Sequence, residues 1–193
     1  MTEIVFATNN FHKLEEIRHA VGKEIKILSL DDIGCFEEIP EDADTIEGNA
    51  SQKSNYIFQK YGRHCFADDT GLEIEAMDGR PGVYSARYAG PGHDHQKNMD
   101  KVLKEMEGVD NRNARFKTVI SLILEGKETF FEGIVTGKIL TEKKGSKGFG
   151  YDPIFQPDGY QASFAEMELS EKNKISHRGR AVRKLLDYLR SPQ

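Results

Sequence analysis

The apolar residues of this chain change their spacing several times, and this change constrains the fold more than any other feature. Residues 3–8 form a short β-branched and apolar run, which is typical of a buried strand. Residues 14–21 then carry apolar side chains at helical spacing up to Gly22, a helix-stopping residue. Residues 25–30 return to a strand-like run. This alternation predicts an α/β fold.

The rest of the chain continues the alternation. The predicted helices cover residues 49–61, residues 96–106 and a final segment opened by Ser176; the predicted strands cover residues 65–67, 116–124 and 129–140. The last two strands flank residues 125–128 and are expected to form an antiparallel hairpin. We find no repeat or linker. We therefore expect a single domain over residues 1–193, with a long twisted mixed sheet flanked by helices.

Composition narrows the function classes. The chain has 193 residues, 37% of them hydrophobic, and a formal net charge of −5. That charge disfavours nucleic-acid binding along the phosphate backbone, and no apolar run is long enough for a membrane helix. Cys35 and Cys65 are the only cysteines, which predicts a reducing compartment. With no signal-peptide pattern at the N-terminus, we expect a cytoplasmic protein.

A polar segment between the first strand and the first helix predicts an anion site. Its residues are Thr8-Asn9-Asn10-Phe11-His12-Lys13. A helix N-terminus presents unpaired N–H groups to an anion, and Lys13 adds a positive charge. The spacing is not that of a P-loop. The alternative interpretation is a plain helix cap made by Asn9 or Asn10.

Acidic residues occur in two places that together suit a divalent cation. Glu38, Glu41 and Asp42 lie in a predicted loop, and Asp68 and Asp69 follow a predicted strand. We expect a bend after that strand to aim both aspartates toward one cation. Oxygen ligands of this kind suit Mg²⁺. The alternative is solvated surface charge, and it is preferred for Glu38 or Asp42 taken singly.

Two further motifs carry aromatic and basic side chains. Gly148-Phe149-Gly150-Tyr151-Asp152-Pro153 allows close backbone approach, and Phe149 could stack on a nucleobase. Its alternative interpretation is a structural turn with core aromatics. Lys172 and Ser176-His177-Arg178-Gly179 place cations and a hydroxyl cap at the start of the last helix. An ordinary capped helix with basic surface residues remains the alternative there.

Taken in order, these motifs resemble the inosine triphosphate pyrophosphatase family, also called XTP/dITP diphosphatases. The similarity also includes Thr45-Ile46-Glu47-Gly48-Asn49-Ala50, Ala67-Asp68-Asp69-Thr70-Gly71 and Gly82-Val83-Tyr84-Ser85-Ala86-Arg87-Tyr88. The resemblance implies hydrolysis of ITP, dITP and XTP to the monophosphate and pyrophosphate, which would keep deaminated purines out of DNA and RNA. It further implies an elongated two-lobed fold with the site in a cleft, a homodimer, and Mg²⁺ dependence.

The resemblance also assigns roles to individual residues. It implies that the Thr8–Lys13 segment and Lys53 bind the phosphates, with Thr70 as a further substrate contact. It implies that Glu41 and Asp69 bind Mg²⁺, that Asp69 is the proton acceptor, and that Asp68 supports it. The implied base pocket consists of Phe149, Gly150, Tyr151, Asp152, Lys172, His177 and Arg178.

Several alternatives stay open on the sequence. Glu38 competes with Glu41 as the second metal ligand. Arg178 could donate to the C6 oxygen of hypoxanthine or xanthine, which adenine lacks. The residue that rejects the 2-amino group of guanine is not identified. Two rival functions are a pyrophosphatase acting on modified pyrimidine nucleotides and a nucleotide-sensing module without turnover, although Asp68-Asp69 argues against the second.

Overall fold

The computed structural model describes residues 2–23 and 25–191, which form two compact units interleaved in sequence. The first unit draws on Met1–Asp69, Thr118–Gly133 and Arg178–Gln193, and the second on Thr70–Lys117 and Ile134–His177. Neither unit is a continuous stretch of chain. The expectation of a single domain stays a prediction.

The observed elements alternate as the sequence predicts. The α-helices are α1 (Phe11–Val21), α2 (Ile46–Tyr61), α3 (His95–Glu105), α4 (Leu169–Ile175) and α5 (His177–Arg190). The strands are β1 (Thr2–Phe6), β2 (Ile25–Leu28), β3 (Cys65–Ile74), β4 (Pro81–Gly82), β5 (Asn113–Leu124), β6 (Lys127–Ile139) and β7 (Phe155–Pro157). Short 3₁₀ turns are η1 (Asp31–Ile33), η2 (Glu75–Met77), η3 (Ser85–Arg87), η4 (Asp152–Ile154) and η5 (Phe164–Glu166).

The described strands form one mixed sheet in the order β2-β1-β3-β5-β6-β7, with β4 paired to β3. Strand β1 is parallel to both β2 and β3, whereas β4 and β7 are antiparallel to their neighbours. Strands β5 and β6 are joined through Glu125 and Gly126, which both have positive φ, at 48° and 80°. Positive φ at two central residues is typical of a tight hairpin turn. The predicted hairpin and the α/β class with a mixed sheet are therefore confirmed.

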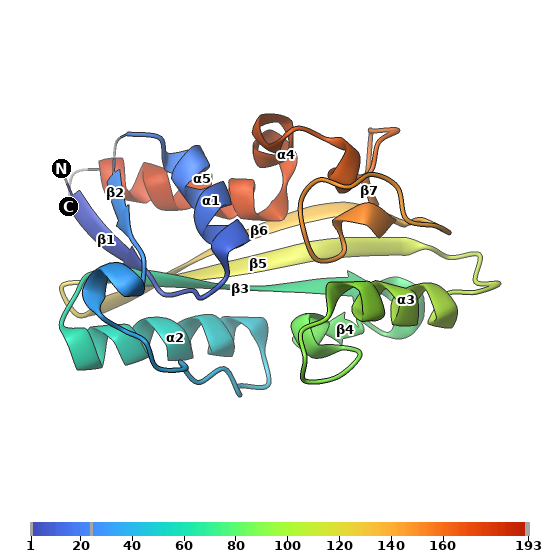
Figure 1. The fold of residues 1–193 in the computed structure, drawn as a ribbon. Coiled ribbons are helices and arrows are strands. Elements are labelled where there is room, and N and C mark those ends of the chain that lie inside the picture. The colour runs from blue at the N-terminus through green and yellow to red at the C-terminus, as the bar shows by residue number, and fades with distance from the viewer. Residues whose placement is uncertain (1, 24, 192–193) are drawn as a thin grey trace. The chain divides into compact units, whose positions relative to one another are not determined.

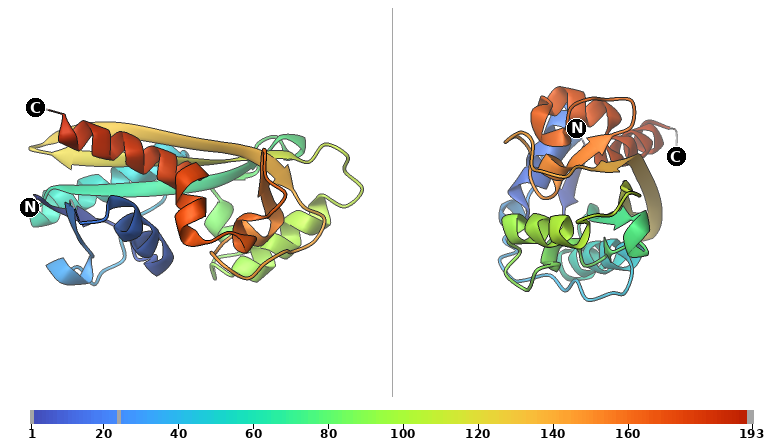
Figure 2. Two further views of the ribbon diagram at one scale, coloured as in Figure 1. Left: turned by 90° about the horizontal axis from the view of Figure 1, so that it is seen from above. Right: turned by 90° about the vertical axis from the view of Figure 1, so that its right-hand side faces the viewer.

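In the first unit, helices cover both faces of the strands (Figure 1). Helices α1 and α5 pack on one face, where Ile17 and Val182 join a core that includes Phe66 of β3. Helix α2 packs on the other face, where Ile57 contacts the cluster of Cys65 and Ala67. Seen from above, α5 lies along the strands (Figure 2). Successive side chains of β3 thus pack against helices on opposite faces of the sheet, because side chains alternate between the two faces along a strand.

The second unit has its own core on one face of its strand segments. Leu72 and Ile74 of β3 pack there with Met99 of α3 and with an aromatic group of three phenylalanines. Those rings are close, with 4.6 Å between the centroids of Phe116 and Phe155. Of the helices formed by residues 2–23 and 25–191, none combines the length and the apolar character that crossing a membrane requires.

Two expectations about the elements need correction. Strand β3 does not end at Ala67 but runs to Ile74, so Asp68 and Asp69 lie inside a strand rather than on a bend after it. Helix α2 begins at Ile46, three residues before the predicted start, because the Thr45 side chain accepts a hydrogen bond from the Gly48 N–H and caps it. The sequence pattern also missed β7 and α4.

Candidate active site

The segment from Thr8 to Lys13 lies between β1 and α1 in the first unit. Asn10 is the N-cap, because its side-chain oxygen accepts from the Lys13 N–H at 3.2 Å. The Thr8 hydroxyl in turn accepts from the Asn10 N–H at 3.1 Å. The cap predicted as an alternative is thus present, made by Asn10 rather than Asn9. The exposed side chains of this segment are those of Asn9, Phe11 and His12.

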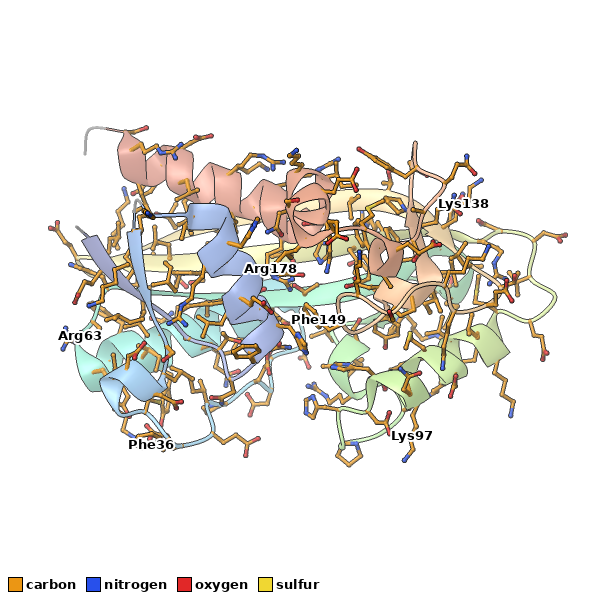
Figure 3. The ribbon with its side chains drawn as sticks, turned by 45° about the horizontal axis from the view of Figure 1, so that its top comes forward. Phe36, Arg63, Lys97, Lys138, Phe149 and Arg178 are labelled. Carbon is orange, nitrogen blue, oxygen red and sulfur yellow. The ribbon has the colours of Figure 1, made fainter. Side chains whose placement is uncertain are left out.

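A buried ionic network lies behind this segment. Lys13 Nζ contacts Asp68 Oδ1 at 3.0 Å, and Arg178 Nε contacts Asp68 Oδ2 at 3.1 Å. Arg178, labelled in Figure 3, also contacts Glu16 of α1 through its Nη1. Asp68, Glu16 and Arg178 are each at most 4% exposed. Burial alone would raise the pKa of Asp68, but the charges of Lys13 and Arg178 hold it below its ordinary value.

Asp68 and Asp69 point to opposite faces of β3. Asp68 contacts residues of α1 and α5, whereas Asp69 Oδ2 accepts a hydrogen bond from Asn49 of α2 at 3.1 Å. The expectation that a bend would aim both carboxylates at one cation is wrong, because side chains alternate across a strand. The two aspartates therefore have different partners and different electrostatic environments.

Asp69 belongs to a second cluster, made with α2 and the loop before it. Lys53 of α2 forms an ion pair with Glu41 of that loop, and the charges of Glu41 and Lys53 both act on Asp69. Asp69 and Lys53 are buried, and Glu41 is half-buried. Burial raises the pKa of Asp69 above its ordinary value, and Lys53 opposes that rise.

The donor chemistry of this cluster fits a hard divalent cation. Glu41 and Asp69 offer carboxylate oxygens, which is the kind of ligand Mg²⁺ takes. Within residues 2–23 and 25–191 no group of three or more His, Cys, Asp or Glu residues could hold a metal. A two-carboxylate set agrees with that finding, since Mg²⁺ commonly binds one or two carboxylates together with substrate phosphates. Glu38 is exposed, so the geometry favours Glu41 over it.

In the second unit, Asp152 organises the loop that precedes η4. Its Oδ2 accepts from the Phe149 N–H at 2.9 Å and from Lys172 Nζ at 2.6 Å. Lys172 is buried and its Nζ lies 5.1 Å from the centre of the Phe149 ring. Gly148 has φ 72°, and a Cβ added there would overlap the Asp152 carboxylate. The structure thus brings Asp152 and Lys172 together with Phe149, which is labelled in Figure 3.

The remaining predicted residues of the second unit lie in its core or on its strands and turns. Tyr151 is 6% exposed and donates to the Ser85 carbonyl at 2.6 Å, so its ring is a core aromatic, as the alternative interpretation of this motif predicts. His177 stacks on Phe116 with 4.6 Å between centroids and 17° between planes. Gly150 has φ 63°, and Thr70 is half-buried on β3.

Two residues of the first unit were missed. Glu16 was detectable, because a carboxylate between Leu14 and Ile17 interrupts the apolar face of a predicted helix. Asn49 lies inside the motif Thr45-Ile46-Glu47-Gly48-Asn49-Ala50, but only the fold shows its contact with Asp69.

Comparison with known proteins supports a family assignment. The sequence profile of the Ham1 family matches residues 4–188. The dITP/XTP pyrophosphatase of Flavobacterium psychrophilum is 57% identical over 189 residues, covering 98% of this chain and 100% of that protein. The dITP/XTP pyrophosphatase of Porphyromonas gingivalis is 52% identical, covering 98% of each chain.

Solved structures support the same family assignment. A HAM1 protein from Coxiella burnetii superposes with a TM-score of 0.88 at 37% identity, covering 98% of each chain. The Ham1 protein of Staphylococcus aureus superposes with a TM-score of 0.87 at 34% identity, covering 97% of this chain and 98% of that one. Because profile, relatives and structures each match nearly the whole chain, the predicted resemblance is confirmed and the chain belongs to the Ham1 family.

Proposed function

We propose that this chain hydrolyses the non-standard purine nucleotides ITP, dITP and XTP to the monophosphate and pyrophosphate. Relatives up to 57% identical over nearly the full length bear the name dITP/XTP pyrophosphatase. The observation that carries the proposal in the structure is the cluster of buried Asp69 and Lys53 with half-buried Glu41. Its proposed role is to keep deaminated purines out of DNA and RNA.

The phosphates are assigned to the first unit. The segment from Thr8 to Lys13 presents the N-terminus of α1, whose unpaired N–H groups favour an anion. Lys13 and Lys53 supply positive charge on opposite sides of β3. Both lysines already contact carboxylates, so they offset the negative charge of Asp68 and Glu41 as well as that of a substrate.

Glu41 and Asp69 are the proposed ligands of Mg²⁺. When bound, the ion would neutralise charge on the phosphates and on the departing pyrophosphate. Asp69 is the proposed proton acceptor for the water that attacks the α-phosphorus. A raised pKa makes a carboxylate a better proton acceptor, which supports Asp69 in this role. Asp68 is held ionised by two cations and is better suited to fixing Lys13 and Arg178 in place.

The base is assigned to residues of the second unit and to Arg178. The residues proposed to contact substrate there are Thr70, Phe149, Gly150, Tyr151, Asp152, Lys172 and His177. Phe149 supplies a partly exposed ring suited to stacking, and Lys172 and Asp152 form a fixed donor and acceptor pair. Arg178 remains a proposed partner of the C6 oxygen, and in the structure it forms ion pairs with Asp68 and Glu16.

The proposal also covers the cellular compartment, the oligomeric state and the partners of the protein. Cys35 and Cys65 are both buried as free thiols, which suits a reducing compartment and supports the cytoplasm. A homodimer is proposed from the family resemblance. The net charge of −5 argues against a nucleic-acid partner.

One panel of substrates tests the proposal. The protein would be incubated with Mg²⁺ and dITP, XTP, GTP, ATP or dUTP, and pyrophosphate would be measured directly. We expect dITP and XTP to be hydrolysed much faster than the other three. Preferred hydrolysis of dUTP would indicate the pyrimidine-directed alternative, and binding without turnover would indicate a nucleotide-sensing module.

A further inference from the structure

Asn49 joins two parts of the first unit that the proposed chemistry needs together. It lies in the first turn of α2 and is 1% exposed. Its Oδ1 accepts from the Ala43 N–H at 2.9 Å, and its Nδ2 donates to Asp69 Oδ2 at 3.1 Å. The amide orientation follows from its partners, because a backbone N–H only donates and an ionised carboxylate only accepts.

The Ala43 contact is one of several that fasten the loop before α2 to the helix. Glu41 pairs with Lys53, and the Asp42 N–H donates to Gln52 Oε1 at 3.1 Å. Ala43, next along the loop, reaches back to Asn49. Three consecutive loop residues therefore contact α2, and the position of Glu41 depends on them.

The Asn49 side chain is not needed to start the helix. Thr45 is the N-cap, and its hydroxyl accepts from the Gly48 N–H at 2.9 Å. The backbone N–H of Asn49 bonds to the Thr45 carbonyl at 3.0 Å, as in any helix. A buried amide must have hydrogen-bond partners to offset its desolvation. Asn49 finds them in Ala43 and Asp69, outside the helix.

We propose that Asn49 is a positioning residue that sets Glu41 and Asp69 in one arrangement able to share a divalent cation. Its oxygen holds the segment that carries Glu41, and its amide group fixes one oxygen of the Asp69 carboxylate. The inference rests on the proposed function for its chemistry, but the placement of the two carboxylates can be measured without turnover.

The test compares Asn49→Leu with Thr45→Ala by Mn²⁺ titration, with unbound Mn²⁺ measured by electron paramagnetic resonance. Leucine has the same number of side-chain heavy atoms and the same branching as asparagine, and it removes both hydrogen bonds. Thr45→Ala removes the cap of the same helix but leaves the hydrogen bond between Asn49 and Asp69 in place. We expect the Kd for Mn²⁺ to rise about tenfold or more in Asn49→Leu, as for loss of a hydrogen bond to a charged group. Thr45→Ala should keep the wild-type Kd.

Turnover of dITP supplies a second readout. In Asn49→Leu we expect kcat to fall about ten- to a hundredfold, while Thr45→Ala lowers only the melting temperature. A wild-type Kd for Mn²⁺ in Asn49→Leu would overturn the inference, as would equal changes in both variants. Wild-type protein that binds no Mn²⁺ would also overturn it.

Two further outcomes are decisive. If Asn49→Leu does not fold, Asn49→Asp keeps the shape and the acceptor for Ala43 while removing the donor to Asp69. A wild-type kcat in Asn49→Asp would contradict the inference, and a large fall in kcat with KM for dITP unchanged would support it. If Mn²⁺ binding is weakened in Asn49→Leu as expected but wild-type protein releases no pyrophosphate from dITP, the proposed function fails and the positioning role stands.

Discussion

At the scale of single residues, the pleat of β3 separates two adjacent aspartates into different environments. Asp68 faces α1 and α5, where Lys13 and Arg178 hold its pKa low. Asp69 faces α2, where burial raises its pKa. The same sequence pair therefore supplies one carboxylate that stays ionised and one suited to accept a proton. The sequence predicted both residues as a site, but the division between them depends on the strand.

We predict that Asp69→Asn lowers turnover of dITP by orders of magnitude while the protein stays folded. The substitution keeps the shape of the side chain and removes its charge, so it removes a proposed metal ligand and the proposed proton acceptor. Steady-state release of pyrophosphate at saturating Mg²⁺ measures the effect. Asp110→Asn, at an exposed residue of the second unit, is the matched control. A near-normal rate in Asp69→Asn would refute the role.

Arg178 gives a prediction about stability. Arg178→Met leaves Asp68 and Glu16 buried without their shared cation. Removing one partner from a buried ion pair commonly costs about 3–5 kcal/mol, and we expect a loss of that order in the free energy of unfolding. Urea denaturation measures it. Adding Glu16→Gln to Arg178→Met should restore part of the lost stability, because one of the two buried carboxylate charges is then removed.

The same position tests base recognition. If Arg178 also donates to the C6 oxygen of the base, Arg178→Ala should lower kcat/KM for ITP about ten- to a hundredfold and change that for ATP much less. Stability loss would lower both rates together, so the ratio of ITP to ATP is the informative quantity. An unchanged ratio would restrict Arg178 to its contacts with Asp68 and Glu16.

At the scale of elements, the start of the first helix was predictable because its cap, Asn10, is local. The extent of β3 was not, because Asp68-Asp69-Thr70-Gly71 reads as a turn. The strand continues through it because β3 pairs with β4 and neighbours β5 in the sheet. Strand β7 has three residues and is defined by its pairing with β6, a contact that a local pattern cannot reveal.

The loop before α2 has a second anchor that predicts a pH effect. Glu37 accepts from Lys60 at 2.6 Å and from Tyr61 at 2.7 Å, and these bonds lower its pKa from 4.5 to about 2. A lowered carboxyl pKa adds stability above the unfolded value, and this stability is lost as pH falls through the folded value. The melting temperatures of wild type and Glu37→Gln should therefore differ most near about pH 6 and converge between about pH 4.5 and about 2.

Lys60→Met provides the control for that experiment. Protein that carries Lys60→Met lacks the positive charge that keeps Glu37 ionised. In that protein, the change in melting temperature caused by Glu37→Gln should depend less on pH. A difference between wild type and Glu37→Gln that stays constant across this pH range would contradict the anchor.

The loop before η4 predicts a steric effect on substrate binding. In Gly148→Ala the new methyl group overlaps the Asp152 carboxylate, which must then move away from Phe149 and Lys172. We expect KM for dITP to rise about tenfold, as for the loss of a charge-assisted hydrogen bond. Gly159→Ala has similar backbone strain, at φ 82°, but no atom within 4 Å of the new methyl group. A rise in KM shared by both variants would assign the effect to strain.

At the scale of the whole molecule, the predicted site residues divide between the two units. The first unit holds Thr8–Lys13, Glu41, Lys53, Asp68, Asp69 and Arg178, and the second holds Thr70, Phe149–Asp152, Lys172 and His177. The family and its motifs were recognisable in the sequence because they are contiguous. The partners of each residue were not, because Lys13, Asp68 and Arg178 meet only through the sheet and its helices.

The central claim is that water attacks the α-phosphorus of a non-standard purine nucleotide and pyrophosphate leaves. The most direct test is hydrolysis of dITP with Mg²⁺ in water enriched in oxygen-18, followed by mass spectrometry of the products. We predict one labelled oxygen in the monophosphate and unlabelled pyrophosphate. Label in the pyrophosphate, or release of orthophosphate in steps, would contradict the account.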